Sequence, residues 1–401
     1  MKILYHHRTA SKDGQAVHIE EMICAMRTLG HEVRVVAPGL VKGATQQGQM
    51  GVEVSWVGRL KSALPRAVYE LLELGYSFVA YRQLLRVARE FEPDFIYERY
   101  NLYLLSGGML KRKLGIPLLL EVNAPLVQER MQHSGGLALR SMGLWAEGKA
   151  WRAADFVLPV THVLAAHVKA YGVPESKISV IPNGINAAHF VSAPDIETAK
   201  QNLGLQGKLV LGFTGFVRDW HGVDRVVKWL ATPSAPTNCV LLVVGDGPVR
   251  AELEKLAMQL GIADRVRFTG VIDRHRVPEH VAVFDIALQP AVTAYASPLK
   301  LMEYLVMGKA VVAPREPNLL EVLTDGDNAL MFDSASLGGF EAALTRLCRD
   351  AILRDRLSIA AKNTITRLDL TWLGNARRVI ELVQALRLRK GVPRVSERPV
   401  A

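Results

Sequence analysis

The amino-acid sequence predicts an α/β protein built from two parallel-sheet domains in tandem. Short runs rich in β-branched and aromatic residues alternate with helical patterns along most of the 401 residues. Alternation of this kind gives parallel sheets joined by right-handed crossovers. The alternation of strand and helix patterns stops at the polar stretch 187–207 and begins again after it. The chain is also long enough for two domains. Ligands bind such folds at the carboxyl ends of the strands, so we expect a site in a cleft between the sheets.

The first domain is expected over residues 1–186. Its predicted strands are Lys2–His7, Glu32–Ala37, Val52–Val57, Asp94–Glu98, Pro117–Val122, Phe156–Val160 and Ser179–Ile181. Its predicted helices are Val17–Leu29, Pro65–Phe91, Leu102–Lys113, Leu137–Arg152 and Leu164–Tyr171. The turn Pro182–Gly184 closes this half, and residues 187–207 are polar enough to form a linker.

The second domain is expected over residues 187–371, followed by a last segment over 372–401. Its predicted strands are Leu209–Thr214, Val240–Val244, Val266–Thr269, Ile286–Gln289, Ala310–Ala313 and Ala329–Phe332. Its predicted helices are Val223–Leu230, Arg250–Leu260, Val277–Val283, Leu299–Met307, Leu319–Leu323 and Phe340–Arg349. In the last segment, Trp372–Leu386 reads as an amphipathic helix and Arg387–Ala401 as a loose basic tail.

The composition is that of a soluble globular protein, with 49% hydrophobic and 22% charged residues. Cys24, Cys239 and Cys348 lie far apart in apolar contexts, so we expect buried thiols in a reducing compartment. Residues Lys2–Tyr5 lead directly into a strand pattern, and no apolar run approaches the roughly 20 residues that span a bilayer. We therefore expect a cytoplasmic protein, with the inner face of the membrane as the alternative location.

The formal net charge of +10 favours an anionic partner. Nucleic acid, an anionic membrane face and a phosphorylated ligand all meet that condition. The basic residues are scattered and no nucleic-acid reader motif is present, so we do not expect a nucleic acid to be the partner.

The stretch 294–314 predicts an anion site at a helix start. Ser297 is a good N-cap and Pro298 suits the first helical position. The N–H groups of Leu299 and Lys300 would then lack intrahelical partners, and Lys300 adds a full charge. Glu303, one turn further on, can accept two hydrogen bonds from a vicinal diol such as a ribose. A phosphate site with an acid beside it suggests a nucleotide; the alternative is an ordinary capped helix.

An ordered set of short motifs resembles glycosyltransferase family 4, the retaining, metal-independent enzymes with two Rossmann-like domains (GT-B fold). The motifs are Gly14, Val180–Gly184, Phe213–Phe216, Trp220–Asp224, Val244–Pro248, Arg267–Gly270, Phe284–Ile286, Ser297–Lys300 with Glu303, Asn318–Glu321 and Asp325–Gly326. The resemblance covers nearly the whole chain. It implies that the closing helix crosses back to the first domain, which suits Trp372–Leu386.

The resemblance implies a nucleotide sugar, most commonly a UDP-sugar, as donor and no separate cofactor. Gly215 and Gly222 would let the backbone approach the diphosphate, Glu303 would hold the ribose, and the Gly270–Ile272 turn would meet the base. The donor-binding positions implied are Gly14, Gly215, Gly245, Ile272, Tyr295, Ser297, Leu299 and Glu303. Lys12 and Gln15 flank Gly14.

The sequence departs from the family pattern at three places. Phe216 and His221 stand where the family commonly has Arg and Lys, so Arg218, His221 and Lys300 would have to neutralise the diphosphate. The alternative for Arg218 is a solvated loop residue. Tyr295 replaces a Glu that often contacts the sugar. Asn123 replaces a His; an Asn can hold a sugar hydroxyl but cannot shuttle a proton. We take Arg218, His221, Lys300 and Asn123 as candidate catalytic residues.

The first domain is expected to receive the acceptor. Glu98 and Arg99 end one predicted strand, and Glu121 ends the next, with Asn123 and Glu129 after it. We take Glu98, Arg99 and Glu121 as acceptor-side residues, with a surface ion pair as the alternative. No pattern of metal ligands is present; His6, His7 and His18 have no suitable spacing.

The predicted helix Pro65–Phe91 mixes large apolar residues with Arg66, Arg82, Arg86 and Arg89. It is either a core helix with a solvated face or a helix whose cationic amphipathic face rests on an anionic membrane. A lipid-linked acceptor would lie in that membrane. The basic run Lys111–Lys113 adds to the second reading.

The function expected from the resemblance is transfer of a sugar, with retention, from a nucleoside diphosphate sugar to an acceptor hydroxyl. The acceptor would be a glycan, a lipid-linked sugar or a small molecule, in glycan, glycolipid or natural-product glycoside synthesis. The diphosphate would leave first, and its own oxygen would help to deprotonate the acceptor. The alternatives are a sugar-nucleotide epimerase of the same architecture and a non-catalytic sugar-nucleotide-binding protein.

Overall fold

The computed structural model describes residues 1–9, 14–38, 64–133 and 135–389. The chain divides into two compact units. The first contains Met1–Pro182 together with the segment that begins at Trp372, and the second is Asn183–Thr371. The predicted strand Val52–Val57 and most of the predicted tail lie outside the described residues.

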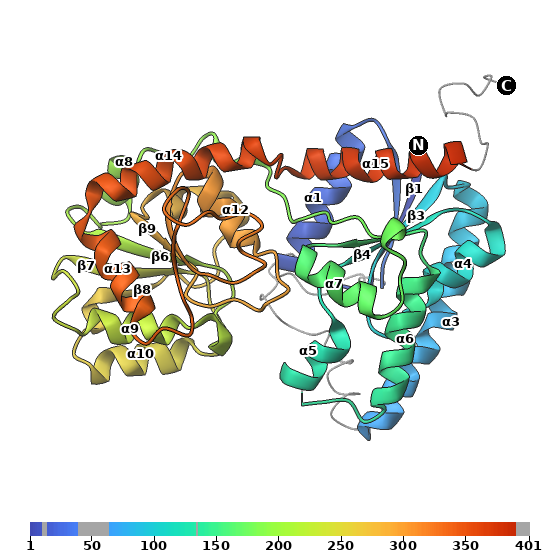
Figure 1. Cartoon of the computed structure of the whole chain (residues 1–401), viewed down its shortest axis with the longest axis horizontal. Coiled ribbons are helices and arrows are strands. Elements are labelled where there is room, and N and C mark those ends of the chain that lie inside the picture. The colour runs from blue at the N-terminus through green and yellow to red at the C-terminus, as the bar shows by residue number, and fades with distance from the viewer. Residues whose placement is uncertain (10–13, 39–63, 134, 390–401) are drawn as a thin grey trace. The chain divides into compact units, whose positions relative to one another are not determined.

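The first unit is a parallel sheet covered by helices (Figure 1). Its strands lie in the order β2-β1-β3-β4-β5. Their bounds are β1 Lys2–His6, β2 Glu32–Val36, β3 Phe95–Arg99, β4 Leu118–Val122 and β5 Phe156–Pro159. Its helices are α1 Gly14–Thr28, α3 Arg66–Phe91, α4 Ser106–Leu114, α5 Leu126–His133, α6 Arg140–Ala153, α7 His162–Ala170 and α15 Trp372–Arg389. Every residue of β3 and β4 is buried, as expected for parallel strands with helices on both faces.

The last helix belongs to the first unit, as the resemblance predicted. Helix α15 packs on α1, where the Trp372 ring meets the His18 ring edge-on at 4.7 Å. Arg387 donates to Asp94 at 2.8 Å, and the Asn375 amide donates to the Pro182 carbonyl at 2.6 Å. These contacts fix both ends of the helix within the unit.

The second unit is a six-stranded parallel sheet in the order β11-β10-β9-β6-β7-β8 (Figure 1). The strands are β6 Leu209–Thr214, β7 Cys239–Val244, β8 Val266–Phe268, β9 Ile286–Leu288, β10 Ala310–Pro314 and β11 Leu330–Phe332. The helices are α8 Ile196–Asn202, α9 Val223–Leu230, α10 Arg250–Gln259, α11 Val277–Ala282, α12 Leu299–Val306, α13 Gly339–Arg349 and α14 Ala351–Arg367, with a 3₁₀ turn, η3, at Asp219–His221.

Two hydrophobic cores cover the two faces of this second sheet. Successive residues of β7 alternate between them, because side chains along a strand point to opposite faces. Leu241 and Val243 join one core, and Val240, Leu242 and Val244 join the other. The predicted alternating-layer architecture is therefore confirmed in both units.

Several local predictions are wrong. Residues 179–181 form no strand; only Ile178 makes an isolated bridge, to Val157. No helix forms over residues 319–323, where 319–322 lie in turns. The stretch 187–207 is not a mere linker, because Ala199 and Leu205 enter a core and Lys200 pairs with Asp285 at 2.9 Å.

Other differences concern exposure and helix α14. Cys24 is exposed, in contrast to the buried Cys239 and Cys348. The sequence analysis missed α14, whose outer face carries Ile352 and Ile359 and therefore lacks a clear polar side. Among the described residues, no helix is long and apolar enough to cross a membrane.

Candidate functional site

The loop that follows β6 has a backbone shape that only glycine adopts readily. Gly215 stands at φ 110° and Gly222 at φ 66°, both in the left-handed region. Between them, Val217 is fully buried and anchors the loop, and η3 turns the chain toward α9. The motif glycines therefore shape a loop at the carboxyl end of a central strand, the usual place for a ligand in this kind of sheet.

A second loop, after β7, supports the first. The Gly215 N–H donates to the Val244 carbonyl at 2.9 Å, and the Val217 N–H donates to the Asp246 carbonyl at 2.8 Å. A Cβ atom at Gly245 would lie 2.2 Å from the Gly215 oxygen, and one at Gly247 would lie 2.0 Å from the Val217 oxygen. These two glycines are therefore required by loop packing.

Lys300 lies beside the Gly215 loop. A lysine that lines an open cleft would have an exposed amine, whereas the amine of Lys300 is buried. Its Nζ atom is buried 3.7 Å from the centroid of the Phe213 ring, and within the described chain it has no hydrogen-bond partner. A Cβ atom at Gly215 would come 3.6 Å from the Lys300 Cε. Burial lowers the pKa of Lys300 to about 7. An ammonium without hydrogen bonds is costly to bury, so this atom retains the capacity to donate to a further acceptor.

His221 faces the same place as a neutral imidazole. Its Nδ1 accepts a hydrogen bond from the Arg218 backbone N–H at 3.0 Å, so the proton resides on Nε2. Burial, together with the charges of Lys300 and Arg218, lowers the pKa of His221 to about 2. His221 can therefore donate one hydrogen bond from Nε2 but contributes no charge at neutral pH.

Arg218 is held between two aromatic rings. The guanidinium carbon lies 5.0 Å from the centroid of the Phe216 ring and 5.0 Å from that of Trp220. The side chain is partly buried, in contrast to the exposed Asp219 beside it. Such cation–π contacts restrict the side chain, so its environment differs from that of a freely solvated loop residue.

Glu303 lies one turn into α12 and is linked to the end of β6. The Thr214 hydroxyl donates to Glu303 Oε2 at 3.1 Å, and the Thr214 N–H donates to the Tyr304 hydroxyl at 2.8 Å. Burial raises the pKa of Glu303, which the Thr214 hydrogen bond and Lys300 partly offset. The carboxylate thus stands close to Gly215 and Lys300 on neighbouring elements of one unit.

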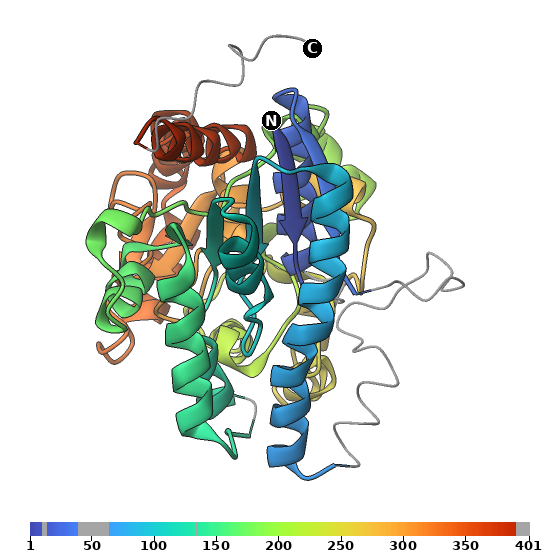
Figure 2. The same cartoon turned by 90° about the vertical axis from the view of Figure 1, so that its right-hand side faces the viewer.

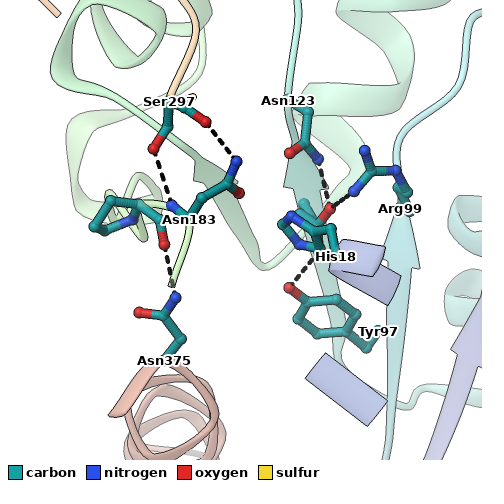
Figure 3. A network of polar contacts seen from close by, with 9 residues as sticks. His18, Tyr97, Arg99, Asn123, Asn183, Ser297 and Asn375 are labelled. Carbon is teal, nitrogen blue, oxygen red and sulfur yellow. Dashed lines mark hydrogen bonds and ion pairs between the residues drawn. The ribbon is translucent and has the colours of Figure 1, made fainter. Parts of the chain in front are cut away.

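The start of α12 differs from the prediction. The helix begins at Leu299, Pro298 takes the N-cap position, and no side chain of the described residues caps the helix. The Ser297 hydroxyl instead accepts from the Asn183 N–H at 3.1 Å, and the Asn183 amide donates to the Ser297 carbonyl at 2.6 Å (Figure 3). Prediction of Ser297 as the N-cap was wrong because its hydroxyl already has this partner. The N–H groups at the helix start are left for another acceptor.

The remaining predicted donor positions lie on loops of different kinds. Tyr295 is partly buried in a loop that Asn318 holds, through donation to the Thr293 carbonyl at 3.1 Å and the Ala296 carbonyl at 2.7 Å. Ile272 packs partly buried against the core that contains α12. In the first unit, Gly14 is the exposed first residue of α1, and Lys12 lies outside the described residues.

Within the first unit, Glu121 is the centre of a buried network (Figure 3). Its carboxylate accepts from the Tyr97 hydroxyl at 2.8 Å and from the side chains of Arg99 and Asn123, and His18 Nε2 lies 2.8 Å away. Burial alone would raise the pKa of Glu121, but His18 and Arg99 outweigh it and hold that pKa well below its usual range. The alternative of a surface ion pair is wrong, since Arg99 and Glu121 are 7% and 2% exposed.

Glu98 lies apart from that network. Its carboxylate lies 2.6 Å from His6 Nδ1. It is also packed against Gly107 near the start of α4, where a Cβ atom would lie 2.6 Å from it. The residue is 2% exposed. Glu98 therefore packs in the interior of the unit, whereas Asn123 is partly exposed at the end of β4.

Sequence reasoning missed the partners that hold these groups. Phe213 under Lys300 and Thr214 beside Glu303 belonged to a predicted strand and to the quoted motif Phe213–Phe216, but neither was given a role at the site. His18 was considered only as one of three histidines. Asn183 and Asn318 lay within quoted motifs, which was the one available signal for them. Across the ranges that the structure describes, no three His, Cys, Asp or Glu side chains gather as a metal site.

Two family descriptions match consecutive parts of the chain. Residues 13–184 match the glycosyl transferase 4-like domain, and residues 195–364 match glycosyl transferases group 1. The 2-deoxystreptamine glucosyltransferase of Streptomyces kanamyceticus is 26% identical over 298 residues, 69% of this chain and 74% of that protein. The GDP-mannose-dependent alpha-mannosyltransferase of Mycolicibacterium smegmatis is 24% identical over 364 residues, 90% of each chain.

Solved structures share the fold. Anabaena HepE in complex with UDP and glucose matches with a TM-score of 0.73 at 19% identity. The match covers 96% of this chain and 100% of the HepE chain. WaaG, a glycosyltransferase involved in lipopolysaccharide biosynthesis, has a TM-score of 0.67 at 19% identity, and covers 95% of this chain and 99% of that one.

Proposed function

Because the chain belongs to the glycosyl transferases group 1 family and is a nucleotide-sugar-dependent glycosyltransferase, we propose that it transfers the sugar of a UDP-sugar with retention of configuration. The epimerase and the non-catalytic binding protein are set aside, since both halves of the chain match transferase families.

One observation carries the proposed donor site: the Lys300 ammonium is buried over Phe213 and has no hydrogen-bond partner among the described residues. A diphosphate oxygen would supply the missing acceptor and the missing opposite charge. The uncapped N–H groups at the start of α12 face the same ligand, and Gly215 leaves the backbone open to it. Arg218 and the Nε2–H of His221 add a second charge and a further donor.

The nucleoside end of the donor is assigned to Glu303 and the Gly270–Ile272 turn. Glu303 would accept two hydrogen bonds from the ribose hydroxyls. UDP is proposed because HepE structures were solved with UDP and with UDP-glucose. The mycobacterial relative is named for GDP-mannose, so GDP is the competing nucleotide in the binding test.

In the proposed reaction, the bond between the anomeric carbon and the diphosphate oxygen breaks first. Lys300, Arg218 and the helix-start N–H groups stabilise the negative charge that grows on the leaving diphosphate. The acceptor oxygen then attacks the anomeric carbon from the same face, and its proton passes to a diphosphate oxygen. Asn123 is assigned to hold a sugar hydroxyl, because an amide cannot take the proton.

The acceptor is assigned to the first unit, where Glu121 fixes Arg99, His18 and Asn123. A glycan, a lipid-linked sugar and a small molecule remain the acceptor classes. Relatives named for 2-deoxystreptamine support the small-molecule class, and LpsD, named for lipopolysaccharide core biosynthesis, supports the glycan class.

Calorimetry with UDP, GDP and their sugars tests the donor assignment. We expect UDP to bind, and Glu303→Gln to weaken binding by about 1.5–3 kcal/mol while the melting temperature stays near that of the parent. Donor turnover should survive a chelator, and NMR of the product should show the anomeric configuration of the donor. Binding of GDP alone would overturn the choice of base, and unchanged affinity in Glu303→Gln would remove this residue from the site.

A further inference from the structure

The first half of helix α3 reverses the usual distribution of side chains on a surface helix, whereas the second half buries Ala80, Leu84, Ala88 and Phe91. The buried face of the first half carries Glu70 and Glu73, which are 3% and 6% exposed. The exposed face of the helix carries Val68, Leu71, Leu72, Phe78 and Val79, with Phe78 and Val79 58% and 61% exposed. A soluble helix normally buries the apolar residues and exposes the acids. Figure 2 shows α3 running along the surface of its unit.

The structure stabilises this reversed arrangement with specific partners. Glu73 pairs with Arg130 at 2.6 Å and with Arg8 at 3.4 Å. Glu70 accepts from the backbone N–H groups of Ala138 and Leu139 at 2.7 and 2.9 Å. Because Glu70 is hydrogen-bonded and Glu73 is ion-paired in the interior, the apolar part of the outer face, as the structure describes it, carries no acid.

The same outer face becomes cationic toward the end of the helix. Arg82, Arg86 and Arg89 are exposed and follow the apolar residues at helical spacing. Arg82 lies over the Phe78 ring at 5.8 Å, where the two parts meet. Glu90, which pairs with Arg86 at 3.5 Å, is the one acid on this stretch of the described helix. The face from Val68 to Arg89 is about 32 Å long at 1.5 Å per residue.

We propose that this face of α3, the apolar residues 68–79 followed by Arg82, Arg86 and Arg89, docks the protein on an anionic lipid bilayer. Apolar side chains would enter the boundary between headgroups and acyl chains, and the arginines would meet the lipid phosphates. An apolar partner protein or a second copy of the chain would account for Phe78 and Val79 but would not require the adjoining arginines. The docking surface is independent of the donor site proposed above.

Sedimentation of the full chain with phosphatidylcholine vesicles, with and without phosphatidylglycerol, tests the proposal. We expect binding only to the anionic vesicles, and weaker binding at higher salt. The cationic variant Arg82→Gln, Arg86→Gln, Arg89→Gln should lose about fivefold per arginine, on the order of 100-fold together. The apolar variant Leu72→Ser, Phe78→Ser, Val79→Ser should lose at least about tenfold.

Matched variants on the second unit serve as controls. Ile352→Ser with Ile359→Ser removes apolar residues that are more exposed than those of α3. Lys255→Gln, Lys362→Gln, Arg367→Gln removes the same charge as the cationic variant, and both control variants should bind as the parent does. Absent binding, equal binding to both vesicle types, or binding unchanged by the α3 variants would overturn the proposal. The proposal would also be overturned if light scattering showed a dimer that only the α3 variants dissociate. That outcome would assign the face to a second copy of the chain. Donor hydrolysis without vesicles separately reports on the donor site.

Discussion

The Lys300 amine is buried and has no hydrogen-bond partner among the described residues. We therefore expect it to contribute to catalysis by binding the diphosphate. We expect Lys300→Ala to lower turnover at saturating donor by about 10²–10³, because one preorganised charge facing the diphosphate is lost. His221→Ala should act in the same direction but less strongly, since a neutral imidazole donates one hydrogen bond only. The measurement is turnover beside a melting curve for each variant.

The melting curve separates this role from a structural one. Removing a buried amine that lacks hydrogen bonds also removes a desolvation cost, so Lys300→Ala should melt no lower than the parent. Parent-like turnover in Lys300→Ala would place the anion site elsewhere and leave α12 an ordinary helix.

The lowered pKa of Lys300 predicts that donor binding takes up a proton. With a pKa of about 7 in the free protein, much of the amine is neutral at pH 8, and a bound diphosphate would favour the charged form. Affinity should therefore fall above about pH 7, and calorimetry in buffers of different ionisation enthalpy should detect uptake of part of a proton. Lys300→Arg, which stays charged, should lose both effects; the same pH slope in that variant would assign the titration to another group.

Folding stability should change with pH in the opposite direction to donor affinity. The folded pKa of Lys300 lies below its ordinary value of 10.5, so the folded state binds fewer protons than the unfolded state between about pH 7 and 10.5. Burial of this amine therefore costs stability below pH 7, and the cost is relieved as the pH rises through that window. The Glu303 carboxylate, which favours the charged amine, partly offsets this cost.

Between elements, the loops after β6 and β7 behave as one packed pair. Gly247→Ala should bring a Cβ atom against the Val217 carbonyl, 2.0 Å away in the present geometry, and force the loops apart. We expect a loss of at least about 2 kcal/mol of stability together with weaker donor binding. Gly75→Ala is the matched control: its Cβ meets open space in α3, and it should stabilise by about 0.5–1 kcal/mol. Denaturant unfolding of both variants checks this, and a Gly247→Ala protein as stable as the parent would contradict it.

Elements with one clear periodicity could be predicted from sequence, and those with mixed exposure could not. Buried runs such as Leu209–Thr214 have a single reading, because both faces of a central parallel strand are apolar. Helix α14 was missed because Ile352 and Ile359 face outward, and the role of Ser297 was wrong because its partner, Asn183, is 114 residues away. The sequence singled out Lys300 by its place at a helix start, but its contact with the Phe213 ring could not be predicted, because no local pattern connects the two residues.

At the scale of the whole chain, the two units should differ in their ability to fold alone. Residues 183–371 are contiguous and contain both cores of the second sheet. We expect this fragment to unfold cooperatively and to bind UDP. Residues 1–182 lack α15, whose buried Ala376, Val379 and Val383 belong to this unit, and should be aggregation-prone. Calorimetry and light scattering of the two fragments check this; a monomeric, cooperative 1–182 fragment would contradict the role assigned to α15.

The return of α15 to the first unit also constrains how such proteins can recombine. The second unit is, in effect, an insertion within the gene segment for the first, so a donor-binding half can be exchanged as a cassette only with two crossovers, near residues 182 and 371. A single crossover brings a foreign α15 along with it. In that chimera, the residues that meet His18 and Asp94 come from another parent, and the compatibility of those two contacts decides whether the hybrid folds.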